Sequence, residues 1–371
     1  MYDIKYFEER YPDYCREMKD TMQHYEWHGE GNVFIHTEMV LNELMNLKEY
    51  QELLEIEQMI LAYSAFFHDI SKFETSTIEN GIISSKGHAK LGEKKARLIL
   101  SGIHFDPMRY YGPRLDKFDF YFREKIVMLV RYHGYPVFYL DKHEYDLIKL
   151  SLKVNIKHLY ILCKADLLGR ITSKENKEES LMKLDYFKEK ALEFNCYENE
   201  FQFENEFAKM YFLKNNRFYT PYIEKHSKVY LMVGIPGVGK DFYIKNNLKD
   251  INEISLDKLR IEMKVKRGDK KREGRLIQEA KKRAKEFLAK KEDFVWNATN
   301  TNISFREPLI DLFLSYKAEV EIIYIEKDFD IVLKQNKNRK NSIPEAYIFD
   351  KLRFIDIPTK DEAHKVKYIL D

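Results

Sequence analysis

The stretch Lys228–Asp241, KVYLMVGIPGVGKD, decides how the second half of the chain folds. An apolar run suited to a buried strand leads into a glycine loop, and a lysine then opens a helix. Gly234, Gly237 and Gly239 let backbone N–H groups approach a phosphate chain, and Lys240 adds a positive charge for the outer phosphates. The spacing G-x-x-x-x-G-K between a strand and a helix predicts a nucleoside triphosphate site.

The bulk properties indicate a folded protein of about two domains, because the chain has 371 residues, 44% of them hydrophobic. The formal charge is only +2, so any affinity for nucleic acid must come from local patches. The three cysteines are sparse and irregularly spaced, which favours reduced thiols. The N-terminus lacks a signal-peptide pattern, and the longest apolar run, Met59–Phe67, is too short to span a bilayer. We therefore expect a cytoplasmic protein without a membrane partner.

The first half of the sequence is predicted to be all-α. Apolar residues recur at helical spacing in five segments, which are Val33–Leu47, Leu53–Ile70, Phe120–Tyr132, Tyr145–Leu168 and Leu181–Phe194. The polar segment 214–227, with Pro221 in its middle, is predicted to be a linker. We therefore expect a helical domain over residues 1–213 and a second domain over 228–371.

The second domain is predicted to be α/β with a parallel sheet. Short apolar runs alternate with amphipathic helical segments, as they do in βα units. The predicted strands are Val229–Val233, Glu253–Leu256, Phe294–Ala298, Val320–Ile325 and Val366–Leu370.

Histidine and aspartate residues in the first half form a candidate metal site. Its members lie within or at the end of predicted helices, and they are His36, His68, Asp69, His88, His133 and Asp166. Imidazole and carboxylate together suit Mn, Fe, Co, Ni or Zn, and the lack of nearby cysteines argues against a structural zinc site. Six ligands are more than one open metal site needs, so the set predicts two divalent metals that clamp a phosphate. A lone histidine is more often structural, so we leave out the other histidines of the first half, which are His24, His28, His104, His143 and His158.

The order H…HD…H…H…D resembles the HD-domain phosphohydrolase superfamily over roughly residues 20–200. The matching segments are IHTEMV, FHDISK, KGHAKLG, RYHGYP and KADLLGR. The resemblance implies metal-dependent hydrolysis of phosphomonoesters or phosphodiesters. Lys72 and Arg170 follow two of these motifs and could neutralise the substrate phosphate, although capping salt bridges would suit them equally.

Further chemistry is predicted beside the glycine loop. Asp257 ends the second strand of the sheet, where it could act as a general base or cap the helix predicted from Lys258. Residues 258–291 hold fifteen Lys or Arg against five Asp or Glu, a local charge of +10 that suits a phosphate backbone or a solvated helix face. Arg339, in the polar loop QNKNRKNSIP, could close over the triphosphate or remain an exposed charge.

These features resemble the polynucleotide 5′-kinase group of P-loop phosphotransferases over about residues 228–355. The matching segments are GIPGVGKD, D-x-x-R from Asp257 to Arg260, A-T-N with Thr299 and Asn300, and N-x-x-R from Asn336 to Arg339. The resemblance implies that Asp257 is the base, that Arg260, Thr299 and Asn300 bind the acceptor, and that Lys240 and Arg339 bind the donor phosphates.

The kinase pattern has two departures. Asp241 replaces the hydroxyl residue that normally binds magnesium, and Asn297 or Ala298 stands where many relatives have an acidic residue. We expect the two to be linked, with Asp241 binding Mg²⁺ and contributing to the nucleotide site.

Together the two halves resemble bifunctional end-healing enzymes of RNA repair. The resemblance implies ATP or another NTP as donor, Mg²⁺ in the kinase site, single-stranded RNA or DNA ends as substrate, and a polynucleotide ligase downstream. The kinase would phosphorylate a 5′-hydroxyl, and the HD domain would remove a 2′,3′-cyclic or 3′-phosphate. Two other interpretations stay open: an HD nucleotidase fused to a small-nucleoside kinase, and a non-catalytic nucleotide sensor.

Overall fold

The computed structural model describes residues 2–103, 117–222, 225–266, 268–339 and 342–370. Internal contacts divide the chain into two compact units, Met1–Gln202 and Phe203–Asp371. Helix α12, Glu206–Asn215, therefore belongs to the second unit. The sequence assigns most of this helix to the first domain. None of the described helices is long and apolar enough to cross a membrane.

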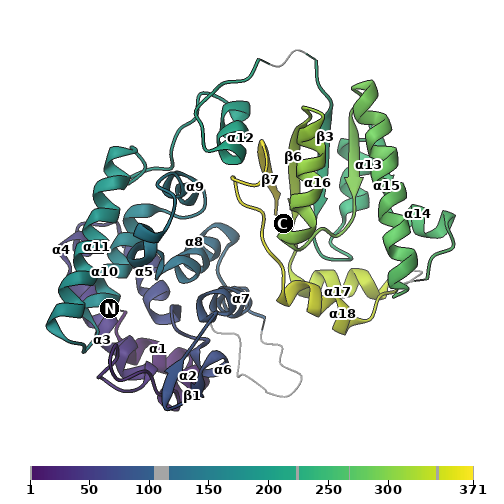
Figure 1. Cartoon of the computed structure of the whole chain (residues 1–371). Coiled ribbons are helices and arrows are strands. Elements are labelled where there is room, and N and C mark those ends of the chain that lie inside the picture. The colour runs from purple at the N-terminus through teal and green to yellow at the C-terminus, as the bar shows by residue number, and fades with distance from the viewer. Residues whose placement is uncertain (1, 104–116, 223–224, 267, 340–341, 371) are drawn as a thin grey trace. The chain divides into compact units, whose positions relative to one another are not determined.

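The described part of the first unit is built from helices and one small hairpin (Figure 1). The helices are α1 (Ile4–Arg10), α2 (Pro12–Lys19), α3 (Val33–Asn46), α4 (Lys48–Gln51), α5 (Glu55–Phe67), α6 (Lys72–Thr75), α7 (His88–Leu100), α8 (Phe120–Tyr132), the 3₁₀ helix η1 (Tyr135–Asp141), α9 (Asp146–Ser151), α10 (Ile156–Leu168) and α11 (Lys174–Glu193). Strands β1 (Thr77–Glu79) and β2 (Ile82–Ser84) pair antiparallel.

Helix α5 runs through the core of this unit. Every residue from Ile60 to Phe67 is buried. Most of these side chains are apolar and point to all sides of the helix, so no face of it is suited to solvent. Phe66 stacks on Phe7 of α1 with ring centroids 4.4 Å apart. The buried stem ends at His68 and Asp69, which are 1% and 2% exposed.

The single helix predicted over Tyr145–Leu168 is wrong. The segment forms two helices, α9 and α10, with Asn155 as the N-cap of the second. Its side chain accepts a hydrogen bond from the backbone N–H of His158 at 2.8 Å. Asparagine competes for backbone groups in this way, which starts a new helix in spite of a continuous apolar period.

The parallel sheet predicted for the second unit is confirmed. Its strands run in the order β4-β5-β3-β6-β7, and all four pairings are parallel. The strands are β3 (Lys228–Val233), β4 (Asn252–Ser255), β5 (Phe294–Asn297), β6 (Glu319–Ile325) and β7 (Lys365–Ile369). Strands β4 and β5 lie on one side of β3 and the later strands on the other. The order in which the chain adds strands to the sheet therefore changes direction next to β3, and α/β sheets bind their ligands at such a point.

Helices connect these strands and cover the sheet. Besides α12 they are α13 (Lys240–Asn247), α14 (Leu256–Glu262), α15 (Lys270–Lys290), α16 (Ile303–Ser315), α17 (Phe329–Lys337) and α18 (Glu345–Arg353). Figure 1 shows α17 and α18 across the end of the sheet where the strands finish.

A buried arginine ties the loop after β5 to the C-terminal segment. Arg306 of α16 is 0% exposed, and its guanidinium binds the Glu362 carboxylate through Nε and Nη2 at 2.7 and 2.8 Å. Its Nη1 donates to the backbone carbonyls of Asn300 and Asp356, each at 2.9 Å. Arg306 thus joins the loop that follows β5 to the segment that follows α18.

We predict that Arg306→Met lowers the free energy of unfolding by about 3–5 kcal/mol, because it leaves the Glu362 carboxylate buried without its cation. Urea unfolding followed by Trp296 fluorescence in a Trp27→Phe background measures this loss. Lys214→Met is the matched control, since it breaks a surface pair with Asp311 and is expected to change the stability by less than about 1 kcal/mol. Equal effects of the two variants would contradict the prediction.

Candidate functional site

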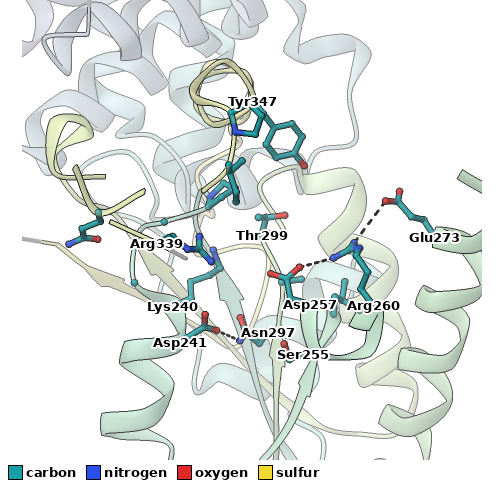
Figure 2. A pocket seen from close by; sticks show the side chains of 18 of the residues that line it. Lys240, Asp241, Ser255, Asp257, Arg260, Glu273, Asn297, Thr299, Arg339 and Tyr347 are labelled. Atoms are coloured by element: carbon teal, nitrogen blue, oxygen red, sulfur yellow. Dashed lines mark hydrogen bonds and ion pairs between the residues drawn. The ribbon is translucent and has the colours of Figure 1, made fainter. Parts of the chain in front are cut away.

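A cavity of about 820 Å³ opens at the carboxyl ends of β3, β4 and β5 (Figure 2). It brings together most of the predicted kinase residues, which are Gly237, Gly239, Lys240, Asp241, Asp257, Arg260, Thr299 and Arg339. Gly234 and Asn300 do not line it. Asn300 is 7% exposed and donates from Nδ2 to the carbonyl of Met232 in β3 at 2.8 Å, so its contact is structural.

The glycine loop needs its glycines for steric reasons. Gly234 has φ +155°, and a Cβ there would lie 2.8 Å from the carbonyl oxygen of Ile325. Gly239 has φ +101° and is the N-cap residue of α13. The backbone N–H groups at the start of α13 are therefore open to an anion, as expected at a helix N-terminus.

Lys240 lies in the floor of the cavity. Its Nζ donates to the carbonyls of Gly234 and Ile235 at 2.8 and 3.0 Å. Burial lowers the pKa of Lys240 to about 8, and the carboxylates of Asp241 and Asp257 oppose this shift only in part. An anionic phosphate would restore the charged form, because it supplies the missing counter-charge.

Asp257 lies in the first turn of α14, and it is not the N-cap. The N-cap is Ser255, whose hydroxyl accepts from the backbone N–H of Lys258 at 3.3 Å. Asp257 instead accepts a 2.6 Å hydrogen bond from Arg260, which also lies 4.0 Å from Glu273 (Figure 2). The Asp257 side chain is 66% exposed, so its carboxylate can be reached from the cavity.

Asn297 joins two carboxylates at the end of β5. Its Nδ2 donates to Asp241 Oδ1 at 2.7 Å (Figure 2). The same Nδ2 donates to Glu253 Oε1 at 2.8 Å. Glu253 also pairs with Lys258. The sequence analysis missed Glu253, because it lies inside the predicted second strand and no motif marks it.

Arg339 follows α17, in a loop organised by Asn336. The Asn336 side chain is 2% exposed, donates to the carbonyl of Ile343 at 2.7 Å and accepts from the N–H of Ile343 at 2.9 Å. The asparagine of N-x-x-R therefore shapes the loop that carries the arginine. Residues 340–341 of the predicted loop lie outside the described residues.

Some cations of the basic stretch form ion pairs with acidic residues of the same stretch, which its local charge of +10 already includes. Arg283 of α15 binds Glu262 and Glu279 at 2.6 and 3.1 Å, and Arg272 pairs with Asp269. Residue 267 lies outside the described residues. The remaining excess charge is a property of the described helix surface rather than of a built pocket.

Five helices of the first unit bring the six predicted metal-type residues together. His36 is on α3, His68 and Asp69 end α5, His88 begins α7, His133 ends α8 and Asp166 is on α10. Five of the six are no more than 5% exposed; His88 alone is partly open to solvent.

The Asp69 carboxylate is the centre of this histidine cluster. Its Oδ2 lies 3.2 Å from His68 Nε2 and 3.8 Å from His36 Nε2, and its Oδ1 lies 3.4 Å from His88 Nε2 and 3.9 Å from His133 Nε2. Two ligand groups therefore share one carboxylate, and each could hold a metal ion. Asp166 extends the first group, since its Oδ1 lies 3.1 Å from His36 Nε2.

Backbone carbonyls fix the orientation of three imidazoles. The Nδ1 atoms of His68, His88 and His133 donate to the carbonyls of Ala65, Ser85 and Val130 at 2.7–2.8 Å. Their Nε2 atoms then carry lone pairs that point inward.

Asp69 Oδ1 has no hydrogen-bond partner among the described residues, although it is buried. A buried carboxylate oxygen facing imidazole lone pairs is unfavourable without a cation. The cluster therefore fits divalent transition metals of the kind predicted from the sequence.

The pKa values of the cluster agree with neutral inner imidazoles. Burial lowers the pKa of His133 to about 3, and His88 and His68 add to the shift. Burial also lowers the pKa of His88. For His36 the hydrogen bonds to Asp166 and Glu30 outweigh burial and raise the pKa, so a proton can hold its place when no metal is bound.

Lys72 and Arg170 both contact the metal-type carboxylates. Lys72 Nζ donates to Asp69 Oδ2 at 2.7 Å and to Gln23 Oε1 at 2.6 Å. Arg170 forms two hydrogen bonds to Asp166. Both cations therefore hold carboxylates of the cluster in place.

The sequence analysis missed two neighbours of His36. Glu30 Oε1 lies 2.8 Å from His36 Nδ1 and 2.9 Å from His28 Nδ1, and the three form another group that could bind a metal. Hydrogen bonds from both histidines overcome burial and lower the pKa of Glu30. His28 was left out as a lone histidine, and only the fold shows that it adjoins His36.

Comparison with known proteins bears on the second unit. Residues 229–352 match the family model described as "AAA domain". A solved structure described as a "putative kinase" from Chloroflexus aurantiacus J-10-fl is 14% identical, with a TM-score of 0.34 over 40% of this chain and 87% of that chain. The match and the glycine loop between β3 and α13 indicate a P-loop domain, which implies a nucleoside triphosphate and Mg²⁺.

We predict that the affinity for a non-hydrolysable ATP analogue falls as the pH rises above about 8, because Lys240 then loses the proton that pairs with phosphate. The dissociation constant, measured by calorimetry from pH 7 to 9.5, should rise by at most about tenfold per pH unit. Lys240→Arg is the control, since arginine stays charged over this range and should give a flat profile. A parallel loss of affinity in both proteins would sink the prediction.

We predict two divalent metal ions per chain in the histidine cluster and none there in Asp69→Asn, because both groups share that carboxylate. His133→Ala should retain one. Metal content after loading with Mn²⁺ or Co²⁺ and desalting measures the stoichiometry, with the exposed His143→Ala as control. Two tightly held ions in Asp69→Asn would contradict the shared-carboxylate arrangement.

Proposed function

We propose that the chain is a bifunctional end-healing enzyme for single-stranded RNA or DNA. The kinase-like P-loop domain would phosphorylate 5′-hydroxyl ends, and the histidine cluster would remove 2′,3′-cyclic or 3′-terminal phosphates. The observation that carries the hydrolase half is the convergence of four imidazole Nε2 atoms on the Asp69 carboxylate. The two reactions would produce the 3′-hydroxyl and 5′-phosphate ends that a polynucleotide ligase joins, so such a ligase is the expected downstream partner.

In the kinase half, the Asp257 carboxylate accepts the proton of the 5′-hydroxyl as its oxygen attacks the γ-phosphorus in line. The bond from the γ-phosphorus to the β–γ bridging oxygen breaks, and the nucleoside diphosphate leaves. Lys240 and Arg339 counter the negative charge that develops on the transferred group. The 2.6 Å hydrogen bond between Arg260 and Asp257 supports this assignment, because it sets a cation next to the proposed base, where it could bind the phosphate of the acceptor.

Asp241 would hold Mg²⁺ in this half. Its carboxylate lines the cavity next to Lys240, and Asn297 fixes one of its oxygens. The neighbouring Glu253 shares the same amide, which favours a site of two carboxylates in place of the usual hydroxyl. When bound, Mg²⁺ would supply positive charge that neutralises the donor phosphates.

In the hydrolase half, two transition metals would polarise the phosphoryl group and activate water when bound. The chain's own residues orient the site: backbone carbonyls fix the imidazoles, Arg170 fixes Asp166, and Lys72 stands beside Asp69. Lys72 can turn its ammonium group from Asp69 to the substrate phosphate, because a metal would take over the neutralisation of that carboxylate.

We predict that the enzyme changes both ends of a short RNA that carries a 5′-hydroxyl and a 2′,3′-cyclic phosphate, given ATP, Mg²⁺ and Mn²⁺. Lys240→Ala should slow 5′-phosphorylation by on the order of 100-fold or more while sparing the 3′ reaction, because it removes a charge that acts in the transition state. His68→Ala should do the reverse, and Lys337→Ala, an exposed lysine of α17, should alter neither.

Mass spectrometry of the RNA separates the outcomes. Reaction of mononucleotides with no change in the RNA would favour a nucleotidase fused to a nucleoside kinase. Binding of ATP without phosphate transfer to any hydroxyl would favour a nucleotide sensor. Strong salt dependence of RNA binding would support the polynucleotide substrate, since contacts to phosphates release counter-ions.

A further inference from the structure

A turn formed by residues 21–32 precedes α3 and exposes two large aromatic side chains. We call it the aromatic turn. Tyr25 is 78% exposed and Trp27 is 43% exposed. The ring of Tyr25 stacks on that of His24, with centroids 5.0 Å apart and an angle of 18° between the planes.

The aromatic turn is closed by its own backbone. The N–H of Gln23 donates to the carbonyl of Gly31 at 3.0 Å, and the N–H of Val33 donates to the carbonyl of Thr21 at 3.0 Å. At the tip, the N–H groups of Trp27 and His28 both donate to the carbonyl of His24. These hydrogen bonds fix the tip before any ligand binds, so little order has to be gained on binding.

The segment after α10 also fastens the turn. The N–H of Gly29 donates to the carbonyl of Ile171 at 2.7 Å, an approach so close that a Cβ on Gly29 would lie 3.0 Å from that oxygen. The Thr172 hydroxyl donates to the carbonyl of Glu26 at 2.7 Å. The aromatic side chains therefore stand on a backbone held from two sides.

The aromatic turn meets the histidine cluster at three points. Gln23 accepts from Lys72, the ring of His28 lies edge-on to that of His36 with centroids 4.6 Å apart, and Glu30 binds His36 Nδ1. Trp27 directly precedes His28, so its backbone adjoins a residue that contacts the cluster.

We propose that the aromatic turn stacks the bases at the 3′ end of a single-stranded nucleic acid whose terminal phosphate enters the histidine cluster, an inference that depends on the proposed function. Aromatic faces bind bases of any sequence. The cations Lys72 and Arg170, on the inner side, suit the phosphate, and the exposed rings suit the uncharged part of the same nucleotide. A small phosphate ester would not reach the turn.

Tryptophan fluorescence tests this directly, because the chain has only two tryptophans and Trp296 is 1% exposed in β5. Protein loaded with Zn²⁺, which has no unpaired electrons, is titrated with a hexanucleotide RNA that ends in a non-hydrolysable 3′-phosphonate. Quenching of Trp27 is taken as the difference between the parent and Trp27→Phe. We expect saturable quenching, and a loss of about five- to 100-fold in affinity when the last two positions are abasic. Abasic positions at the 5′ end should have little effect.

A kinetic comparison separates this inference from the proposed function. Trp27→Ala should raise KM for the RNA about five-fold or more and leave the hydrolysis of an aryl phosphate unchanged. Tyr121→Ala is the control, since Tyr121 is 56% exposed in the first turn of α8, at the opposite end from His133. Hydrolysis of RNA at an unchanged KM, without quenching, would overturn base stacking and leave the end-healing function standing. Quenching without hydrolysis of any RNA end would overturn that function and retain the stacking site.

Discussion

The buried negative charge of Asp69 is the constraint on which the first unit depends. Its carboxylate is 2% exposed, lies within 4 Å of four imidazole Nε2 atoms and is the meeting point of helices that are distant in sequence. Lys72 neutralises one oxygen, and the other has no hydrogen-bond partner among the described residues. A buried carboxylate in this arrangement costs free energy unless a cation neutralises it. The helices therefore pack around a negative charge that a bound metal ion would neutralise.

The second unit has a positive charge, that of Lys240, at its candidate site. Lys240 is half-buried with its ammonium group against two carbonyl oxygens, and its pKa is lowered to about 8. The unit therefore holds a positive group that an anionic phosphate would stabilise, whereas the first unit holds a carboxylate that a cation would stabilise. In the absence of its ligand, each site has an unfavourable electrostatic free energy. This is a general property of preorganised sites.

The sequence predicts most of this because its signals are local. The glycine loop and the alternation of strands and helices depend on short spacings. The six metal-type residues are spread from His36 to Asp166, and the order of their motifs predicts the set, whose side chains the structure brings together. Two features could not be predicted in the same way. The break between α9 and α10 depends on one capping asparagine within a continuous apolar pattern. Glu253 acts through Asn297, which is distant in sequence, so only the folded chain identifies it. Glu30 is close to His36 in sequence but lies in a turn that no motif marks, and the fold shows that its carboxylate reaches the imidazole.

The shared carboxylate of Asp69 is the central claim, and the electron paramagnetic resonance spectrum of the Mn²⁺-loaded protein tests it most directly. Two manganese ions bridged by one carboxylate lie close enough to couple magnetically, about 3.5–4 Å apart in two-metal sites. We expect a spin-coupled signal in the spectrum of the Mn²⁺-loaded protein and its disappearance in Asp69→Asn. A spectrum of isolated six-line Mn²⁺ ions at full loading of the unmodified protein would contradict it.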